Sequence, residues 1–105
     1  MKIGLHYSFQ VAPSASASGA ASQATIRQGL EDIAWADVNG FSSVVFASHH
    51  FMDDCWIPRP LQMATAAAAI TKNVRVGTDI IILPLQHPVV VAEEAAITDH
   101  THSIA

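Results

Sequence analysis

The chain has 105 residues, of which 50% are hydrophobic and 13% are charged, and its formal net charge is -4 at pH 7. This length suits one small domain, and so apolar a composition excludes a disordered chain. The basic residues are scattered instead of forming a stripe, which argues against a nucleic-acid partner. The single cysteine, Cys55, cannot form an intrachain disulfide, and the apolar runs are too short to span a bilayer. We therefore predict a cytoplasmic protein without a membrane partner.

Residues 2–9 carry large apolar side chains that partly alternate with polar ones, and this pattern predicts a first strand. Residues 13–24 are rich in serine and alanine and contain Gly19, so they predict a loop. Composition alone favours a flexible connection for this loop over a cover for a binding site.

Between residues 25 and 41 the apolar side chains recur at helical spacing, which predicts an amphipathic helix that covers a sheet. Thr25 and Gln28 are placed as a capping box at its start, and Asn39-Gly40 as its stop. Trp35 has the spacing of a residue that packs between helix and sheet. The acidic side chains of this segment are expected on its solvated face: Glu31, Asp32 and Asp37.

Residues 42–51 combine β-branched and aromatic side chains and end in two histidines, which predicts a buried strand. Successive side chains of a strand point to opposite faces, so Val45, Ala47 and His49 share one face and His50 lies on the other. We therefore expect His49 to point inward, on the side of the small residues, and His50 to point outward.

The second half of the chain continues the alternation of strand and helix. Residues 61–71 are mostly alanine and predict a helix. Residues 74–83 form a continuous apolar run, as expected for a strand covered on both faces, and Gly77 within it indicates a bulge or a close backbone approach. Residues 84–88 predict a turn, and residues 89–100 predict a third helix.

Strand and helix thus alternate three times, an order that implies parallel strands with the helices packed outside the sheet. A closed barrel needs eight such units and roughly 250 residues, so we predict an α/β fold that forms the first three units of a TIM barrel. Ligands of such folds bind at the carboxyl ends of the strands. His49 lies at this edge as a catalytic candidate, and His50 and Tyr7 lie there as candidates for a substrate pocket.

Other chemistries at this edge have weaker support. Metal ligation is conceivable from the residue types of His49, His50, Asp53, Asp54 and Cys55. Adjacent strand residues point apart, however, and no second ligand cluster follows, so we expect no metal. The cysteine has no base fixed beside it, and no glycine-rich phosphate loop follows a strand. A structural role for the histidine pair stays as open as a catalytic one.

Several short stretches follow one another in an order and spacing that is specific as a set. They are Leu30-Glu31-Asp32 with Trp35-Ala36-Asp37, Gly40-Phe41-Ser42-Ser43-Val44, Ser48-His49-His50-Phe51, Pro58-Arg59-Pro60-Leu61-Gln62-Met63-Ala64, Val74-Arg75-Val76-Gly77-Thr78, Leu83-Pro84-Leu85-Gln86-His87-Pro88, and Ala92-Glu93-Glu94 with Asp99-His100. Over nearly its whole length the chain resembles the amino-terminal part of the bacterial luciferase-like monooxygenase family.

The resemblance implies a TIM barrel that binds reduced FMN, or a related deazaflavin coenzyme, at its carboxyl-end face. Family members typically let the reduced flavin react with dioxygen and oxygenate a small organic substrate such as an aldehyde or a ketone. The first histidine of the family's Glu-His-His motif corresponds to His49, so the resemblance makes His49 a general base or hydrogen-bond partner. Ser48 stands where the family usually has glutamate.

The resemblance also implies where the flavin lies. Thr78, Asp79 and Ile80 correspond to the family's third strand, which passes beside the flavin ring, and an unusual non-proline cis peptide would join Asp79 to Ile80. Asp79 stands where a small residue is common. Family members commonly pair, so the resemblance implies a homo- or heterodimer for a full-length protein.

Two alternatives stay open. The chain could be a non-catalytic, truncated relative that persists as a partner or remnant, with sheet edges that another chain covers. It could also belong to a deazaflavin-dependent oxidoreductase, which uses the same barrel and needs no oxygen. Because three units hold only part of a pocket, we expect residues 1–105 alone, a partial barrel domain, to be inactive.

Overall fold

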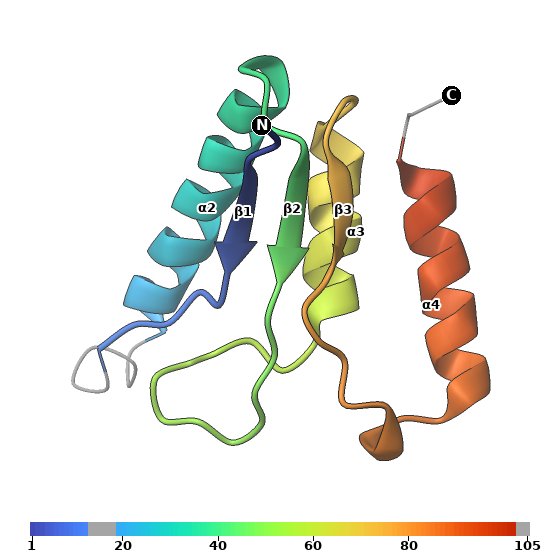
Figure 1. The fold of residues 1–105 in the computed structure, drawn as a ribbon. Coiled ribbons are helices and arrows are strands. Elements are labelled where there is room, and N and C mark those ends of the chain that lie inside the picture. The colour runs from blue at the N-terminus through green and yellow to red at the C-terminus, as the bar shows by residue number, and fades with distance from the viewer. Residues whose placement is uncertain (13–18, 103–105) are drawn as a thin grey trace.

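The structure, a computed structural model, describes residues 1–12 and 19–102. Its parallel sheet has the strand order β1-β2-β3 (Figure 1). The elements are β1 (Gly4–Tyr7), α2 (Ala20–Val38), β2 (Ser43–Phe46), α3 (Pro60–Ile70), β3 (Arg75–Thr78), a short 3-10 helix η1 (Leu83–Leu85) and α4 (Pro88–Thr101). The predicted alternation of parallel strands and helices is confirmed.

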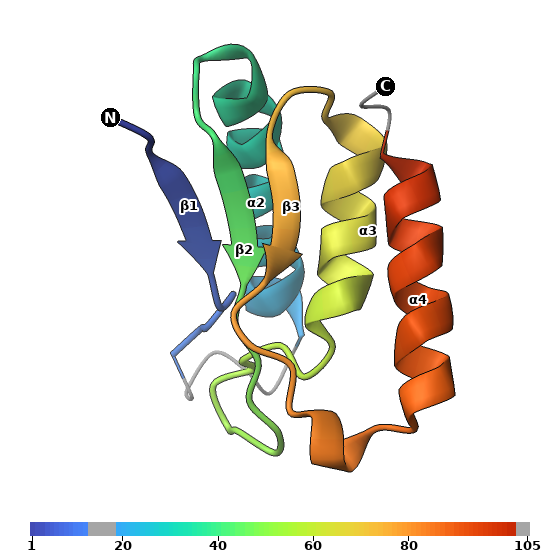
Figure 2. The ribbon, with the colours of Figure 1, turned by 45° about the vertical axis from the view of Figure 1, so that its right-hand side comes forward.

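The helices lie on one side of the sheet (Figures 1 and 2). Val44 and Phe46 of β2 face them and are fully buried with Ile33 of α2 and Ala64 of α3. Val45, between the two buried residues, is half-buried on the other face. Helix α4 packs against α3 (Figure 2). One sheet face is therefore covered by helices, and the other is open among the residues described.

The strands are shorter than the sequence predicted. Each has four residues, whereas strands over 2–9, 42–51 and 74–83 were expected. The register is regular through Gly77, which pairs with Val45, so of the two alternatives for Gly77, a bulge or a close backbone approach, the bulge is absent. Beyond β3 the apolar run leaves the sheet, and Ile80 and Leu83 are exposed. The apolar run was predicted to be a strand buried on both faces. Composition does not show where the chain leaves the neighbouring strand to which it is hydrogen-bonded, so the end of β3 was predicted too late.

Helix α2 begins at Ala20 and not at the predicted capping box of Thr25. Gly19 occupies the N-cap position with a positive φ of 72°, and no side chain caps the helix. Residues 20–24 are mostly alanine and glutamine, which favour a helix, so the loop prediction was wrong for them. Residues 13–18 of the predicted loop lie outside the described residues. The predicted stop is confirmed, since Asn39 is the C-cap and Gly40 has a φ of 85°.

Two side chains of α2 lie opposite to expectation. Trp35 is 60% exposed and contacts Phe41 edge-on instead of packing on the sheet. Asp37 is only 7% exposed, whereas we expected it in solvent. Its carboxylate accepts hydrogen bonds from the backbone N–H groups of Lys72, Asn73 and Val74, at 2.9, 2.7 and 2.9 Å. The burial of Asp37 follows from the loop that precedes β3, which helical spacing cannot reveal.

Candidate active site at the carboxyl ends of the strands

The carboxyl ends of the strands lie at one edge of the sheet, with the loops that lead into α3 and α4 (Figure 1). Backbone hydrogen bonds continue past the strand ends. The Ala47 N–H donates to the Tyr7 carbonyl at 2.9 Å, and the Asp79 N–H donates to the Phe46 carbonyl at 2.8 Å. This edge is therefore held in place beyond the regular sheet.

The loop of residues 47–59 is tied back to the end of β1. The Ile57 N–H donates to the Ser8 carbonyl at 3.2 Å, and the Ile57 carbonyl accepts from the His49 N–H at 3.2 Å. The Val11 N–H donates to the Asp54 carbonyl at 2.8 Å. These bonds place the loop that carries His49 against the segment that follows β1.

His49 lies at the surface of this loop, and its ring contacts that of Trp56. The two ring centroids are 4.0 Å apart and the planes are inclined by 49°. His49 is exposed and His50 is half-buried. The prediction that His49 points inward assumed that the strand continues to His49. This assumption was wrong, because β2 ends at Phe46. The loop, and not the pleat of a strand, determines where the imidazole lies.

Asp54 supplies a carboxylate near His49. Its Oδ2 accepts from the Gln10 side-chain amide at 2.7 Å, and its Oδ1 accepts from the Trp56 backbone N–H at 3.2 Å. The hydrogen bond from Gln10 contributes most to lowering the pKa of Asp54, and the Trp56 N–H and the nearby His49 lower it further. The loop thus places a carboxylate close enough to the His49 imidazole for their charges to interact.

The indole Nε1 of Trp56 is buried and has no hydrogen-bond partner within residues 1–12 and 19–102. Indole N–H groups are donors that normally find an acceptor when buried. An acceptor atom of a bound molecule would satisfy this donor, and Trp56 is therefore a candidate contact beside His49.

A second imidazole and carboxylate lie on the open face of the sheet. His6 pairs in register with Val45 and Gly77, so it lies on the face opposite Phe46. Its Nε2 is 3.5 Å from Oδ2 of Asp79. Asp79 was predicted from the sequence as a site residue, whereas His6 was not. Strand alternation could have indicated His6, because His6 and Gly4 lie on the same face of β1, and this face continues on β2 at Val45.

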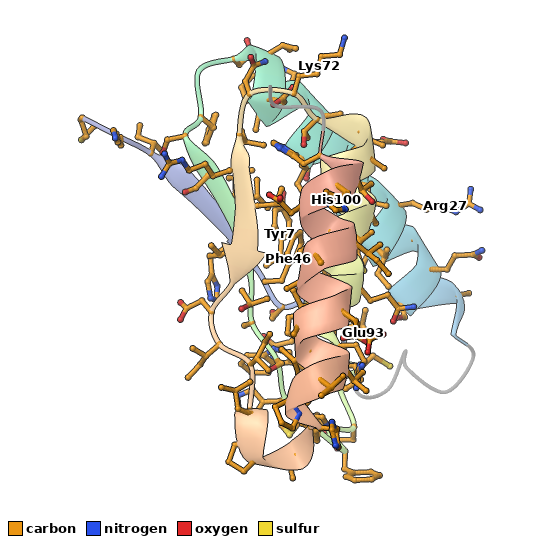
Figure 3. All side chains as sticks on the ribbon, turned by 90° about the vertical axis from the view of Figure 1, so that its right-hand side faces the viewer. Tyr7, Arg27, Phe46, Lys72, Glu93 and His100 are labelled. Atoms are coloured by element: carbon orange, nitrogen blue, oxygen red, sulfur yellow. The ribbon has the colours of Figure 1, made fainter. Side chains whose placement is uncertain are left out.

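Two predicted site residues do not reach this open face. Thr78 pairs in register with Phe46, on the side of the helices. Tyr7 lies on that side too, stacked on Phe9 and Phe46 with ring centroids 5.1 and 6.2 Å apart (Figure 3). Burial raises the pKa of Tyr7, and the negative charge of Asp32 raises it further. The side chain of Tyr7, which was predicted to line a substrate pocket, therefore packs against the aromatic core from its periphery.

The loops after β2 and β3 are joined at the site. The Ser48 hydroxyl donates to the carbonyl of Ile80 at 2.7 Å. The peptide bond between Asp79 and Ile80 is cis, as the family resemblance implied. Ser48 was noted only as a departure from the family's glutamate, and its role as a link between two loops was not foreseen. Only the fold brings its hydroxyl to the loop that follows β3.

Gly77 leaves its position on the open face without a side chain. A Cβ atom there would contact only Val45 Cγ1, at 3.8 Å. The His6 imidazole and the Asp79 carboxylate meet on the same face.

No three His, Cys, Asp or Glu side chains among residues 1–12 and 19–102 lie close enough together to hold a metal ion. None of the described helices has the length and apolar character needed to cross a membrane.

Residues 1–102 match the family model described as luciferase-like monooxygenase. The chain belongs to this family. The oxygenase component of flavin-dependent trigonelline monooxygenase from Acinetobacter baylyi is 38% identical over 64 residues, covering 61% of this chain and 18% of the relative. Limonene 1,2-monooxygenase from Rhodococcus erythropolis is 31% identical over 75 residues, covering 71% of this chain and 19% of the relative. The chain thus spans about a fifth of the length of these curated relatives.

Solved structures give the same assignment of the fold. The oxygenating constituent of 3,6-diketocamphane monooxygenase from Pseudomonas putida, solved in complex with FMN, superposes with a TM-score of 0.77 and 27% identity, over 97% of this chain and 28% of that one. A monooxygenase from Streptomyces bottropensis superposes with a TM-score of 0.80 and 29% identity, over 96% and 30%. The predicted α/β fold of parallel units from a luciferase-like TIM barrel is confirmed.

Proposed function

We propose that the natural polypeptide carrying this chain is a flavin-dependent monooxygenase that uses reduced FMN and dioxygen to oxygenate a small organic substrate. The observation that carries the proposal is the superposition on a relative solved with FMN, together with family membership over residues 1–102. Relatives named as flavin-dependent and limonene monooxygenases support the same class of reaction.

The chain forms the first three units of the barrel in this proposal, as one partial domain. Its open sheet face would become the inner face of the barrel, and the edges of β1 and β3 would pair with further strands. Three units enclose a ligand on one side only, so residues 1–105 alone would bind flavin weakly and exclude little water.

The residues present fit a flavin. Gly77 leaves its position on the open face without a side chain, and the buried Trp56 N–H is a donor that an acceptor atom of a bound molecule could satisfy. The strand end at residues 78–80 would border the ring, with Asp79 on the open face and the Ile80 carbonyl held by Ser48. When bound, reduced FMN supplies the electrons that activate dioxygen, so that one oxygen atom enters the substrate and the other leaves in water.

His49 would hold or move one proton at a ring nitrogen close to the reacting atoms. Imidazole suits this task because its ordinary pKa lies near neutrality. Asp54 would keep a negative charge near the imidazole, and Trp56 would fix the position of its ring. His50, half-buried on the same loop, would border the substrate pocket.

Replacing His49 tests the assignment. In the natural polypeptide, His49→Ala is expected to lower turnover about 100-fold or more while the Kd for FMN changes little, because a general acid–base group contributes about that much. His100→Ala, an exposed change on α4, is the matched control and should keep full turnover. Turnover and FMN titration are measured on the same preparations, and undiminished turnover of His49→Ala would contradict the role.

Oxygen uptake identifies the cofactor class. Consumption of dioxygen with reduced FMN, coupled to substrate oxygenation, is expected. Substrate oxidation with a deazaflavin and without oxygen would instead assign the polypeptide to the deazaflavin-dependent oxidoreductases. The absence of saturable binding of either flavin would favour a non-catalytic relative.

A further inference from the structure

Ser48 is a buried polar residue between the end of β2 and His49. Its hydroxyl donates to the carbonyl of Ile80 at 2.7 Å, and the residue is only 9% exposed. Ile80 lies two residues beyond the end of β3, and its own side chain is 71% exposed. The hydrogen bond therefore joins two loops that follow neighbouring strands.

Three consecutive residues after β2 are each bound to a different segment of the chain. The Ala47 N–H donates to the Tyr7 carbonyl at the end of β1. The His49 N–H donates to the Ile57 carbonyl, farther along the same loop. Between them, Ser48 is bound to the loop after β3, and it uses its side chain. The Ser48 hydrogen bond is thus the one of the three that a substitution removes without changing a backbone group.

This hydrogen bond holds the chain where it leaves β3. The Asp79 N–H still donates to the Phe46 carbonyl of β2, at 2.8 Å. Farther on the backbone hydrogen bonds are local, such as the one from the Leu83 N–H to the Ile81 carbonyl at 3.1 Å. A neutral hydrogen bond adds little to the stability of strands that a backbone ladder already joins. The main effect of the Ser48 hydroxyl is therefore on the relative position of the two loops.

We propose that Ser48 is a positioning residue, whose hydroxyl holds the loop after β3 against the loop that carries His49 and so fixes where the imidazole lies. The inference rests on the proposed function, in which His49 holds or moves a proton. Because Ser48 and His49 are adjacent, a shift of Ser48 displaces the imidazole from Trp56, whose ring centroid is 4.0 Å away. Displacing a group by about 1 Å is enough to lower a reaction rate severely. A hydroxyl that touches no reactant thus governs turnover through its neighbour.

The first readout is the position of the imidazole, measured by NMR on the natural polypeptide without flavin or substrate. The ring-proton resonance of His49, in protein labelled at histidine, is assigned by its absence from His49→Ala, and its chemical shift depends on the ring current of Trp56. Ser48→Ala removes only the hydroxyl, and it should move this resonance toward the value of a freely exposed histidine. Ser48→Thr keeps a hydroxyl and should leave the resonance close to its wild-type value.

Thr71→Val is the matched control. Thr71 follows α3, before the amino end of β3, and is 2% exposed, and its hydroxyl donates to the Ala67 carbonyl at 2.8 Å. Loss of this buried hydroxyl should leave the His49 resonance unchanged even where thermal unfolding shows a lower midpoint. Equal displacement of the resonance in Ser48→Ala and Thr71→Val would assign the effect to general destabilisation and overturn the proposal. Circular dichroism checks that each variant folds, and Ser48→Cys, with a weaker donor of similar size, keeps the test decisive if Ser48→Ala does not.

The second readout is the reoxidation of reduced FMN by dioxygen in the natural polypeptide, which flavin absorbance follows and which needs no organic substrate. Ser48→Ala should change its rate about tenfold, in the same direction as His49→Ala, because the imidazole is displaced. The double variant should match His49→Ala, since Ser48 acts through His49. Additive effects of the two substitutions would give Ser48 a separate role and contradict the inference.

The two proposals fail differently. A His49 resonance that is unchanged in Ser48→Ala overturns the positioning role alone, whether or not the protein binds flavin. Wild-type protein without saturable binding of reduced FMN overturns the proposed function, and the His49 resonance then still decides whether Ser48 positions the ring.

Discussion

At the scale of single residues, the clearest departure from the sequence analysis is Asp37. Three backbone N–H groups before β3 donate to its carboxylate, and they would otherwise lack these partners at a partly buried turn. Burial by itself raises the pKa of Asp37, but the hydrogen bonds from Val74, Asn73 and Lys72 together outweigh it and lower the pKa below the ordinary value. Asp37 therefore anchors the entry to the third strand to the end of α2.

Asp37→Ala is expected to lower the free energy of unfolding by about 3 kcal/mol, because it leaves these donors unpaired. Asp37→Asn retains one acceptor oxygen and should cost less. Glu31→Ala, an exposed change on the same helix, is the control and should stay within about 0.5 kcal/mol. Urea unfolding measures all three, and equal effects of Asp37→Ala and Glu31→Ala would show that the anchor is unimportant.

At the scale of elements, the packing of α2 onto the segment after β1 depends on a glycine. Gly29 is buried in the middle of the helix, and a Cβ there would collide with the ring of Phe9. Phe9 is itself buried, with a φ of 58°, and stacks on Phe46 at a centroid distance of 5.9 Å. Helix propensity alone would favour alanine at this position, so tertiary contact and local preference disagree here.

Gly29→Ala is expected to destabilise the protein by about 1–2 kcal/mol, since overpacking outweighs a propensity gain of about 1 kcal/mol. A double-mutant cycle with Phe9→Ala tests the cause. In the Phe9→Ala background the ring is gone, and Gly29→Ala should become neutral or stabilising. If Gly29→Ala destabilises both backgrounds equally, the collision with Phe9 is not its cause.

At the scale of the whole molecule, the helices cover one face of the sheet and leave the other open, together with the edges of β1 and β3 (Figure 2). The chain nevertheless has a core on the covered side, with Tyr7 and Asp37 at its periphery. The pKa shifts of these two residues make the stability of the described fold depend on pH at both extremes.

Stability is expected to fall on both sides of neutrality. The folded pKa of Asp37 lies below its ordinary value of 3.8, so its contribution is present above that pH and is lost as pH falls through the folded pKa. The folded pKa of Tyr7 lies above 10.0, so its contribution is present below pH 10.0 and is lost as pH rises through the folded pKa. Asp37→Asn should flatten the acid limb of a plot of unfolding free energy against pH, and Tyr7→Phe the alkaline limb. Limbs unchanged by these substitutions would assign the dependence to other groups.

The sequence by itself determined the alternation of strands and helices, the stop of α2 at Asn39-Gly40 and the family. These follow from local causes, namely hydrophobic period, helix propensity and a glycine with positive φ, and from ordered motifs that need no contact to be recognised. It also predicted that the candidate residues gather at one edge of the sheet, because parallel strands end together.

Only the tertiary structure decided which side chains meet there. Alternation ends where a strand ends, so the placement of His49 against Trp56 depends on a loop tied to Ile57 and on no periodic pattern. Asp37 is buried, and His6 meets Asp79 across β2, because segments distant in sequence supply their partners. Periodicity describes one element at a time, whereas each of these contacts joins two elements, and their relative position is a property of the folded chain.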